Sequence, residues 1–399
     1  MSTSGLSKAG LDRMHEVMAA HVRNGDVPGL VTAVSRHGES YVDVVGAATV
    51  GGAPMKRDTI FRISSMTKPI TAVATLILAE ECRLRLDEPV DRLLPELAGR
   101  RVLTRLDADL DDTEPARRPI TVRDLLTFTA GSGMLMGPPG AYPIADALAD
   151  SGLPGGPPRS APAPEAAEWL RRFAELPLMH QPGEQWMYHT GSTILGALVE
   201  RAAGQSFESF LQDRVFEPLG MHDTGFAVPE AKLGRLATVY LNDGAGGLGV
   251  YDGVDDSRWR ETPAFPDGGA DLVSTVDDYL AFAHMLLARG RHPGGRLLSR
   301  HSVEAMTSDQ LTPAQKARTG PGLFDNHGYG YGVSVVTRRD TPALSPGAYG
   351  WDGGLGSCWA NDPGEDTVAI LLTQKMWDSP EPPPIRSDFF ATVYAALDD

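Results

Sequence analysis

The sequence predicts an α/β protein in which an antiparallel sheet is flanked by helices and a mainly helical domain is inserted into the α/β part. Along the chain, the apolar pattern changes from mixed α/β to all-α and back to α/β. The length of 399 residues favours two sub-structures rather than one core. We therefore expect an α/β domain at residues 1–85 plus 236–399, a mainly helical domain at 86–235, and an active site between them.

The N-terminal segment is expected to form a helix followed by a β-hairpin. Residues 7–24 carry apolar side chains at helical spacing, and the Pro and Gly at 28–29 end this pattern. Residues 30–36 and 40–48 then flank a turn at 37–39, and this arrangement is typical of two paired strands.

The centre of the chain is expected to be mainly helical. A long, mostly apolar helix begins at Ser65, and such a helix is normally buried. Further candidate helices span residues 122–128, 164–175, 192–203 and 207–215. Residues 137–164 are rich in Pro and Gly, which indicates either a plain surface loop or a loop that shapes the mouth of a pocket.

The C-terminal third returns to α/β patterning. Residues 271–290 contain an amphipathic helix, with Ser274 or Thr275 as its N-cap. Strands are expected at 328–336, 356–362 and 366–374, and a helix at 387–397 closes the chain.

Composition excludes several classes of partner. The net charge of −16 would repel phosphates, so we expect neither nucleic-acid binding nor attachment to anionic membranes. The sequence contains no apolar run of membrane-spanning length and no apolar leader near its start. Cys82 and Cys358 suggest no disulfide framework, and the histidines show no metal-binding spacing. We expect a cytoplasmic protein without metal or cofactor, and the sequence leaves its oligomeric state open.

Ser65 and Lys68 form an S-x-x-K pair at the start of the apolar helix. Residues three apart on a helix share a face, so the lysine amine would lie near the serine hydroxyl. A serine needs a base to become a nucleophile, and a lysine can serve once its surroundings favour the neutral amine. The alternative is an N-capping serine beside an unrelated surface lysine.

The segment Phe61-Arg62-Ile63-Ser64-Ser65-Met66-Thr67-Lys68 resembles the active-site segment of class C β-lactamases and their relatives. Those relatives are family VIII carboxylesterases, D-alanyl-D-alanine peptidases and a few acyltransferases. Four further segments also resemble sequences of that family, at residues 86–90, 121–127, 216–224 and 272–275. The resemblance therefore covers about residues 10–395. It implies a β-lactamase/transpeptidase-like fold, although Phe128 stands where the family usually has His.

The resemblance also implies the second catalytic motif, around Tyr188. In this family a tyrosine at that place takes the proton from the serine and returns it to the leaving group. Thr190 stands where the family often has Asn, and His189 is expected at the rim of the site. We therefore expect Tyr188 to be catalytic, and His189 and Thr190 to lie near the substrate.

The stretch that begins at Trp351 resembles the third motif of the family, which is K-T-G in β-lactamases. Trp351 stands at the position of the lysine. An indole offers an apolar wall where a cation would recognise a carboxylate, which favours neutral esters. Gly353 and Gly354 follow, and the backbone N–H groups of Ser65 and Gly354 would form the oxyanion hole. Asp352 would repel an anion if it faced the pocket; its alternative role is that of a turn residue.

The resemblance thus implies a serine hydrolase that cleaves carboxylic esters through a Ser65 acyl-enzyme. Its expected partner is a small-molecule ester or acyl substrate. An acyltransferase using the same intermediate, a β-lactamase or D-alanyl-D-alanine peptidase, and a non-enzymatic binder are the alternatives. The sequence has no G-x-S-x-G motif, which disfavours the α/β-hydrolase fold.

Overall fold

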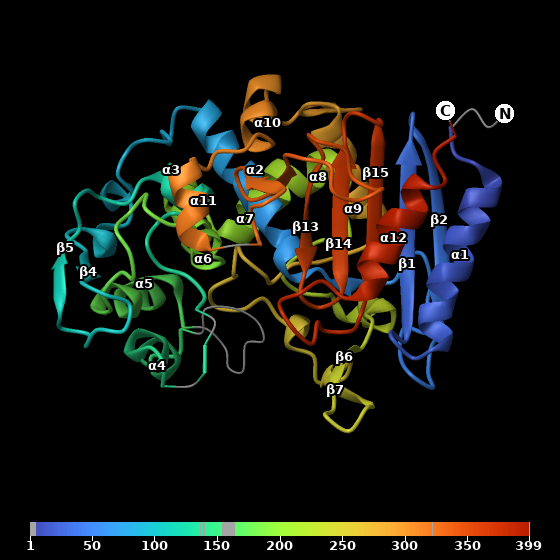
Figure 1. The fold of residues 1–399 in the computed structure, drawn as a ribbon, viewed down its shortest axis with the longest axis horizontal. Coiled ribbons are helices and arrows are strands. Elements are labelled where there is room, and N and C mark those ends of the chain that lie inside the picture. Colours follow the sequence, from blue (N-terminus) through green and yellow to red (C-terminus); the bar gives the residue numbers. More distant parts are fainter. Residues whose placement is uncertain (1–4, 136, 139, 154–163, 321, 399) are drawn as a thin grey trace.

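A seven-stranded antiparallel sheet forms the centre of the computed structural model, which describes residues 5–135, 137–138, 140–153, 164–320 and 322–398. The strand order is β11-β12-β13-β14-β15-β1-β2 (Figure 1). These strands are β1 (Gly29–Arg36), β2 (Glu39–Gly46), β11 (His327–Tyr329), β12 (Ser334–Val336), β13 (Tyr349–Gly353), β14 (Ser357–Asp362) and β15 (Thr367–Thr373). The N-terminal hairpin thus completes a sheet whose other strands come from the end of the chain.

Twelve α-helices surround or extend this sheet within the described residues. They are α1 (Lys8–Arg23), α2 (Thr67–Glu80), α3 (Val122–Leu126), α4 (Pro143–Asp150), α5 (Ala166–Glu175), α6 (Thr190–Ala203), α7 (Phe207–Leu211), α8 (Glu217–Leu219), α9 (Val276–Leu287), α10 (Arg300–Met306), α11 (Pro313–Thr319) and α12 (Pro384–Tyr394). The remaining strands form two-stranded ribbons: β3 (Phe61–Arg62) with β8 (Val273–Ser274), β4 (Arg101–Leu103) with β5 (Thr113–Pro115), β6 (Val239–Asn242) with β7 (Leu248–Asp252), and β9 (Arg291–His292) with β10 (Gly295–Arg296).

Helices cover both faces of the sheet, because apolar side chains point to both faces along the strands. On β1, Leu30 and Val34 pack in the cluster that contains α1 and α12, whereas Val31 and Ala33 pack in the cluster that contains α9. Successive side chains of a strand point to opposite faces, so an apolar residue at nearly every position produces a sheet buried on both sides. The expected β-lactamase/transpeptidase-like architecture is confirmed: an antiparallel sheet between helices, with helices inserted between its strands.

The middle of the chain is mainly helical, as predicted. Helices α3 to α8 and the short β4–β5 ribbon all lie between residues 101 and 219, and Figure 1 shows most of them gathered to one side of the sheet. The division into domains 1–85 plus 236–399 and 86–235 stays a prediction. The expectation of a plain loop at 137–164 was wrong in part, because α4 forms there; residues 139 and 154–163 lie outside the described residues.

Several other boundaries differ from the prediction, and two of these differences have a clear local cause. Residues 328–336 do not form one strand, because Gly332 has a φ of +74° and the chain turns there between β11 and β12. The last helix begins at Pro384, three residues before its expected start at 387, and a proline at the first helical position explains this start. No helix in the described parts of the chain is both long and apolar enough to cross a bilayer.

Candidate active site

Ser65 and Lys68 meet at the N-terminal end of α2. Ser65 lies in a short 3₁₀ turn, Ser64–Met66, that leads directly into the helix. The Lys68 Nζ lies 2.9 Å from Ser65 Oγ, and the two side chains are nearly inaccessible, with Ser65 3% and Lys68 0% exposed. The interpretation of Lys68 as an unrelated surface residue is therefore wrong.

The β3–β8 ribbon holds this turn in place. Phe61 pairs with Ser274 and Arg62 with Val273, and the Ile63 amide then donates to the Leu272 carbonyl at 3.0 Å. Arg62 is fully buried and bonded to the carboxylate of Asp252. Two segments about two hundred residues apart in sequence therefore fix the approach to Ser65.

Tyr188 completes a three-residue cluster with Ser65 and Lys68. Its hydroxyl donates to Ser65 Oγ at 2.7 Å, and the Lys68 Nζ lies 4.5 Å from the centre of the Tyr188 ring. The serine oxygen is thus within hydrogen-bonding distance of both an amine and a phenol. Such an arrangement can take a proton from the serine and pass it to a leaving group.

Trp351 lies on β13, next to Tyr188. Its indole Nε1 donates to the Tyr188 oxygen at 3.1 Å, and the two ring centres are 5.6 Å apart. The sequence predicted an apolar wall here but did not predict this hydrogen bond. Trp351 is therefore both a ring surface at the site and a donor to the phenol.

The glycines after Trp351 let β13 approach the nucleophile. A Cβ on Gly353 would overlap the Ile63 carbonyl, two residues before Ser65, so this close approach requires glycine. Gly354 lies in the turn after β13, and its carbonyl accepts from the Trp377 amide at 2.9 Å. Its N–H as part of an oxyanion hole stays a prediction.

Asp352 is directed to α12. It follows Trp351 on a strand, where neighbouring side chains point to opposite faces. Its carboxylate binds Arg386 of α12, with Nε–Oδ1 and Nε–Oδ2 distances of 2.9 and 2.8 Å. Asp352 is therefore neither a turn residue nor an anion-repelling group in the site.

His189 differs from the expectation of a residue at the rim. His189 is 3% exposed and its Nδ1 lies 3.1 Å from Lys68 Nζ, so it contacts the lysine from inside the protein. Thr190 is the first residue of α6 and is also buried. Contact of either residue with substrate stays a prediction.

The turn at residues 267–271 also contacts Lys68, although no sequence pattern marked it as part of the site. Here the Gly269 carbonyl accepts from Lys68 Nζ at 2.6 Å, and Asp267 lies 3.4 Å from the His189 ring. The Asp-Gly-Gly sequence at 267–269 signals a tight turn, but it does not reveal which side chain the turn will meet. A closer reading of that motif could have predicted the turn, though not its contact with Lys68.

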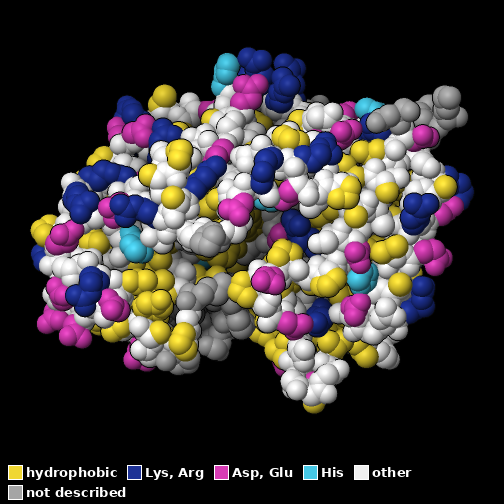
Figure 2. Space-filling model, in the orientation of Figure 1, with side chains coloured by type: hydrophobic (Ala, Val, Ile, Leu, Met, Phe, Trp, Pro, Cys, Tyr) yellow, Lys and Arg dark blue, Asp and Glu magenta, His cyan; other side chains and the backbone are white. Residues whose placement is uncertain are grey.

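Aromatic rings form a layer beside Tyr188. Phe128, Trp186, Tyr329 and Trp351 pack around it, and the Trp186 and Tyr188 rings stack at 5.8 Å. Figure 2 shows a recess near the middle of one face of the molecule, with hydrophobic side chains inside. An apolar layer of rings around Tyr188 suits an uncharged organic substrate.

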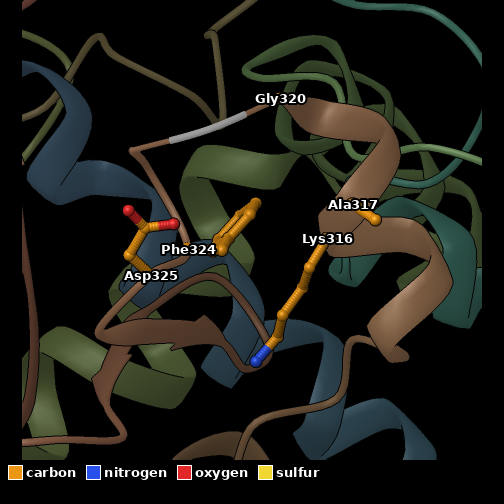
Figure 3. Close-up of a pocket in the computed structure, with 5 residues that line it drawn as sticks. All are labelled: Lys316, Ala317, Gly320, Phe324 and Asp325. Atoms are coloured by element: carbon orange, nitrogen blue, oxygen red, sulfur yellow. The ribbon is translucent and has the colours of Figure 1, made fainter.

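A separate pocket of about 260 Å³ lies at the outer edge of this aromatic layer. Figure 3 shows its lining: Lys316 and Ala317 of α11, then Gly320, Phe324 and Asp325 from the segment that follows. Phe324 meets Trp186 edge-on at 5.3 Å. The pocket therefore adjoins the Tyr188 layer without including Ser65.

Known proteins are similar to this chain in sequence and in fold. The Beta-lactamase family profile matches residues 14–386. Protein Rv1367c of Mycobacterium tuberculosis is 38% identical over 359 residues, covering 88% of this chain and 86% of that protein. Esterase EstB of Burkholderia gladioli is 33% identical over 392 residues, covering 92% of this chain and 91% of its own.

A solved structure agrees in fold. EstCE1, described as a hydrolase with promiscuous acyltransferase activity, superposes with a TM-score of 0.82 at 25% identity, covering 97% of this chain and 99% of the other. The match therefore extends over both the sheet and the helical part that together surround Ser65. From its sequence, fold and relatives, this chain belongs to the β-lactamase family.

Proposed function

We propose that this protein is a carboxylesterase that works through an acyl-enzyme on Ser65. The observation that carries the proposal is the position of Ser65 Oγ, 2.9 Å from Lys68 Nζ and 2.7 Å from the Tyr188 oxygen. Esterase EstB, similar over most of the chain, supports ester cleavage as the reaction. The apolar ring layer and the uncharged Trp351 favour neutral esters, as in family VIII carboxylesterases.

Acylation requires one proton to move from the serine to the leaving alcohol. Ser65 Oγ attacks the carbonyl carbon while the Lys68–Tyr188 pair takes its proton. The carbonyl oxygen becomes negative and needs N–H donors, a role we assign to Ser65 and Gly354. When the C–O bond breaks, the Tyr188 hydroxyl donates the proton to the alkoxide, and an alcohol leaves.

Deacylation repeats these steps with water. The same pair takes a proton from a water molecule, and the resulting hydroxide attacks the acyl carbonyl. Ser65 Oγ then leaves and recovers a proton through Tyr188, which releases the carboxylic acid. No other group needs to change its protonation state, so three side chains suffice for the full cycle.

Transfer of the acyl group to an alcohol or amine is the second candidate. The specific observation in its favour is the likeness to EstCE1, a hydrolase with promiscuous acyltransferase activity. An acceptor would replace water in the second half of the cycle.

We also propose a cytoplasmic location, which the two free cysteines, Cys82 and Cys358, support.

The test compares the wild-type protein with Ser65→Ala on a short-chain p-nitrophenyl ester. We expect turnover to vanish in Ser65→Ala while the circular dichroism spectrum stays unchanged. Ser209→Ala, on α7 and outside the site, is the matched control and should keep full activity. Undiminished turnover by Ser65→Ala would refute the proposal. Adding an alcohol acceptor then separates the candidates, because a transferase yields the new ester at the expense of free acid.

A further inference from the structure

A buried histidine and a buried carboxylate lie in line behind Lys68. The Nδ1 of His189 is 3.1 Å from Lys68 Nζ. The Nε2 of the same ring is 3.4 Å from Oδ2 of Asp267, whose side chain is 0% exposed. The mechanism above uses neither residue, and a buried charge next to a catalytic amine calls for an explanation.

The backbone at His189 is strained in a way that aims the ring at Lys68. His189 has φ +85° and ψ −62°, and the Thr190 amide donates across it to the Tyr188 carbonyl at 3.3 Å. This is a γ-turn with positive φ, which is rare and costly for a residue with a side chain. Strain of this kind persists at functional sites when the rest of the fold holds it in place.

The hydrogen bonds of Lys68 can be counted. A neutral amine has two N–H groups and one lone pair, whereas an ammonium has three N–H groups and no lone pair. The Gly269 carbonyl, at 2.6 Å, and His189 Nδ1, at 3.1 Å, can each accept one N–H. The lone pair of the neutral amine then faces Ser65 Oγ at 2.9 Å.

This count requires His189 Nδ1 to carry no proton. The Asp267 carboxylate favours that tautomer, because its negative charge, with Oδ2 3.4 Å from Nε2, stabilises a proton on Nε2 rather than on Nδ1. Asp267 is itself fixed, since its Oδ1 accepts from Thr193 Oγ1 at 2.7 Å and from the Gly269 amide at 2.8 Å. One carboxylate thus orients both the histidine and the turn that supplies the Gly269 carbonyl.

We propose that His189 and Asp267 are positioning residues that direct the lone pair of Lys68 at Ser65. The inference rests on the proposed function, because it presumes Ser65 as nucleophile. Asp267 sets the tautomer of His189, His189 accepts one N–H of the amine, and Lys68 is left ready to accept the serine proton.

Two substitutions at one position test the histidine. His189→Gly removes the acceptor and also relieves the positive φ, and this relief offsets part of the stability lost with the buried ring. Thermal unfolding checks that the variant is folded. We expect its kcat to drop at least about ten-fold with KM little changed. His189→Asn tolerates the same backbone and places an amide oxygen near the position of Nδ1, so kcat should stay within about three-fold of wild type.

A matched control is His284→Asn, since His284 is a half-buried histidine on α9 whose Nε2 lies 2.9 Å from Ser35 Oγ, away from the site. Its kinetics should equal those of the wild type. Wild-type kcat in His189→Gly, or equal losses in the Gly and Asn variants, would overturn the proposal.

The pH profile provides a readout that a purely structural role would not move. The titratable groups against the His189 ring are Lys68 of α2, Tyr188 beside it and Asp267 of the 267–271 turn. A proton on Nδ1 would turn the acceptor into a donor that faces the amine. The acid limb of kcat/KM should therefore shift to lower pH in His189→Asn. Superimposable acid limbs would contradict the inference.

A double-mutant cycle tests whether Asp267 acts through the histidine. Asp267→Asn can keep an oxygen toward Thr193 and Gly269, but it turns an amide N–H to His189 and favours the wrong tautomer. We expect at least about a ten-fold loss of kcat in the wild-type background and little further loss in His189→Asn. Equal losses in both backgrounds would contradict the chain of contacts. An active Ser65→Ala would refute the proposed function itself, so the two failures are distinguishable.

Discussion

The indole N–H of Trp351 donates a hydrogen bond to the hydroxyl oxygen of Tyr188 across 3.1 Å. The same oxygen lies 2.7 Å from Ser65 Oγ. A donor at a phenol oxygen stabilises negative charge there, so Trp351 favours Tyr188 as a proton acceptor. It does so without a formal charge, and the site gains a donor while it stays suited to neutral substrates.

Replacing Trp351 by Phe removes this donor and keeps an aromatic ring. One neutral hydrogen bond contributes about 0.5–1.5 kcal/mol, so kcat for a p-nitrophenyl ester should fall roughly two- to ten-fold. KM should change little, because the ring surface remains. Steady-state kinetics measure both quantities, and an unchanged kcat would show that the hydrogen bond plays no part in turnover.

Replacing Trp351 by Lys places a cation where Trp351 now lies. Because a cation attracts the carboxylate of a β-lactam, we expect the rate on anionic β-lactams to rise relative to the rate on neutral esters. Parallel assays with nitrocefin and a p-nitrophenyl ester give that ratio. A ratio equal to that of the wild type would exclude Trp351 as the selectivity element.

The buried pair of Arg62 and Asp252 should be essential for stability. Burial lowers the pKa of the Arg62 guanidinium to about 10, and the Asp252 carboxylate opposes this shift. Asp252→Asn leaves a buried charge without its partner, so the free energy of unfolding should fall by about 3–5 kcal/mol. Chemical denaturation measures this quantity.

An exposed pair supplies the control for that experiment. Lys8 and Asp12 form an ion pair at 2.7 Å on the surface of α1. Asp12→Asn should leave the free energy of unfolding nearly unchanged, because an exposed ion pair is screened by water. If the Asp252 and Asp12 variants lost equal stability, the buried pair would not be what anchors the strand before Ser65.

The Glu96–Arg201 pair predicts how stability depends on pH. The hydrogen bonds from Arg201, at 2.7 and 2.6 Å, lower the pKa of Glu96 from its ordinary 4.5. A carboxylate with a lowered folded-state pKa contributes stability that is complete above its unfolded pKa and is lost as pH falls through the folded one. The pair joins the segment 95–97 to the C-terminal half of α6.

The corresponding variant is Arg201→Gln, which removes the cause of that shift. Its unfolding temperature should lie below that of the wild type near neutral pH, and the gap should narrow as pH falls below about 4.5 toward 3. Thermal unfolding followed by circular dichroism provides the data. A gap of the same size at every pH would mean that Glu96 contributes no linked stability.

Local patterns predicted most of the sheet and the closeness of Ser65 to Lys68. Strand β1 was predictable because its side chains, which point alternately to the two faces of the sheet, are apolar at nearly every position. The closeness of Ser65 and Lys68 was predictable because residues three apart on a helix lie on the same face. Tyr188 followed from the resemblance of its motif rather than from spacing. These features depend on sequence neighbours or on a recognisable motif.

The support behind Lys68 was not predictable in the same way. Position 189 has a positive φ that the sequence does not reveal, and this angle turns His189 inward instead of to the rim. Asp267 reaches that ring across 78 residues, through a contact that only the folded chain creates. The direction of the Trp351 N–H likewise depends on how β13 packs against Tyr188. Side-chain direction at a site is thus set by tertiary packing.

The most direct test of the account is the mass of the protein after an acid quench during ester turnover, followed by peptide mapping. The acyl-enzyme mechanism predicts one added acyl group on the peptide that contains Ser65 in the wild-type protein, and none in Ser65→Ala. An acyl group on another residue, or steady turnover with labelling by a fluorophosphonate elsewhere than Ser65, would contradict it.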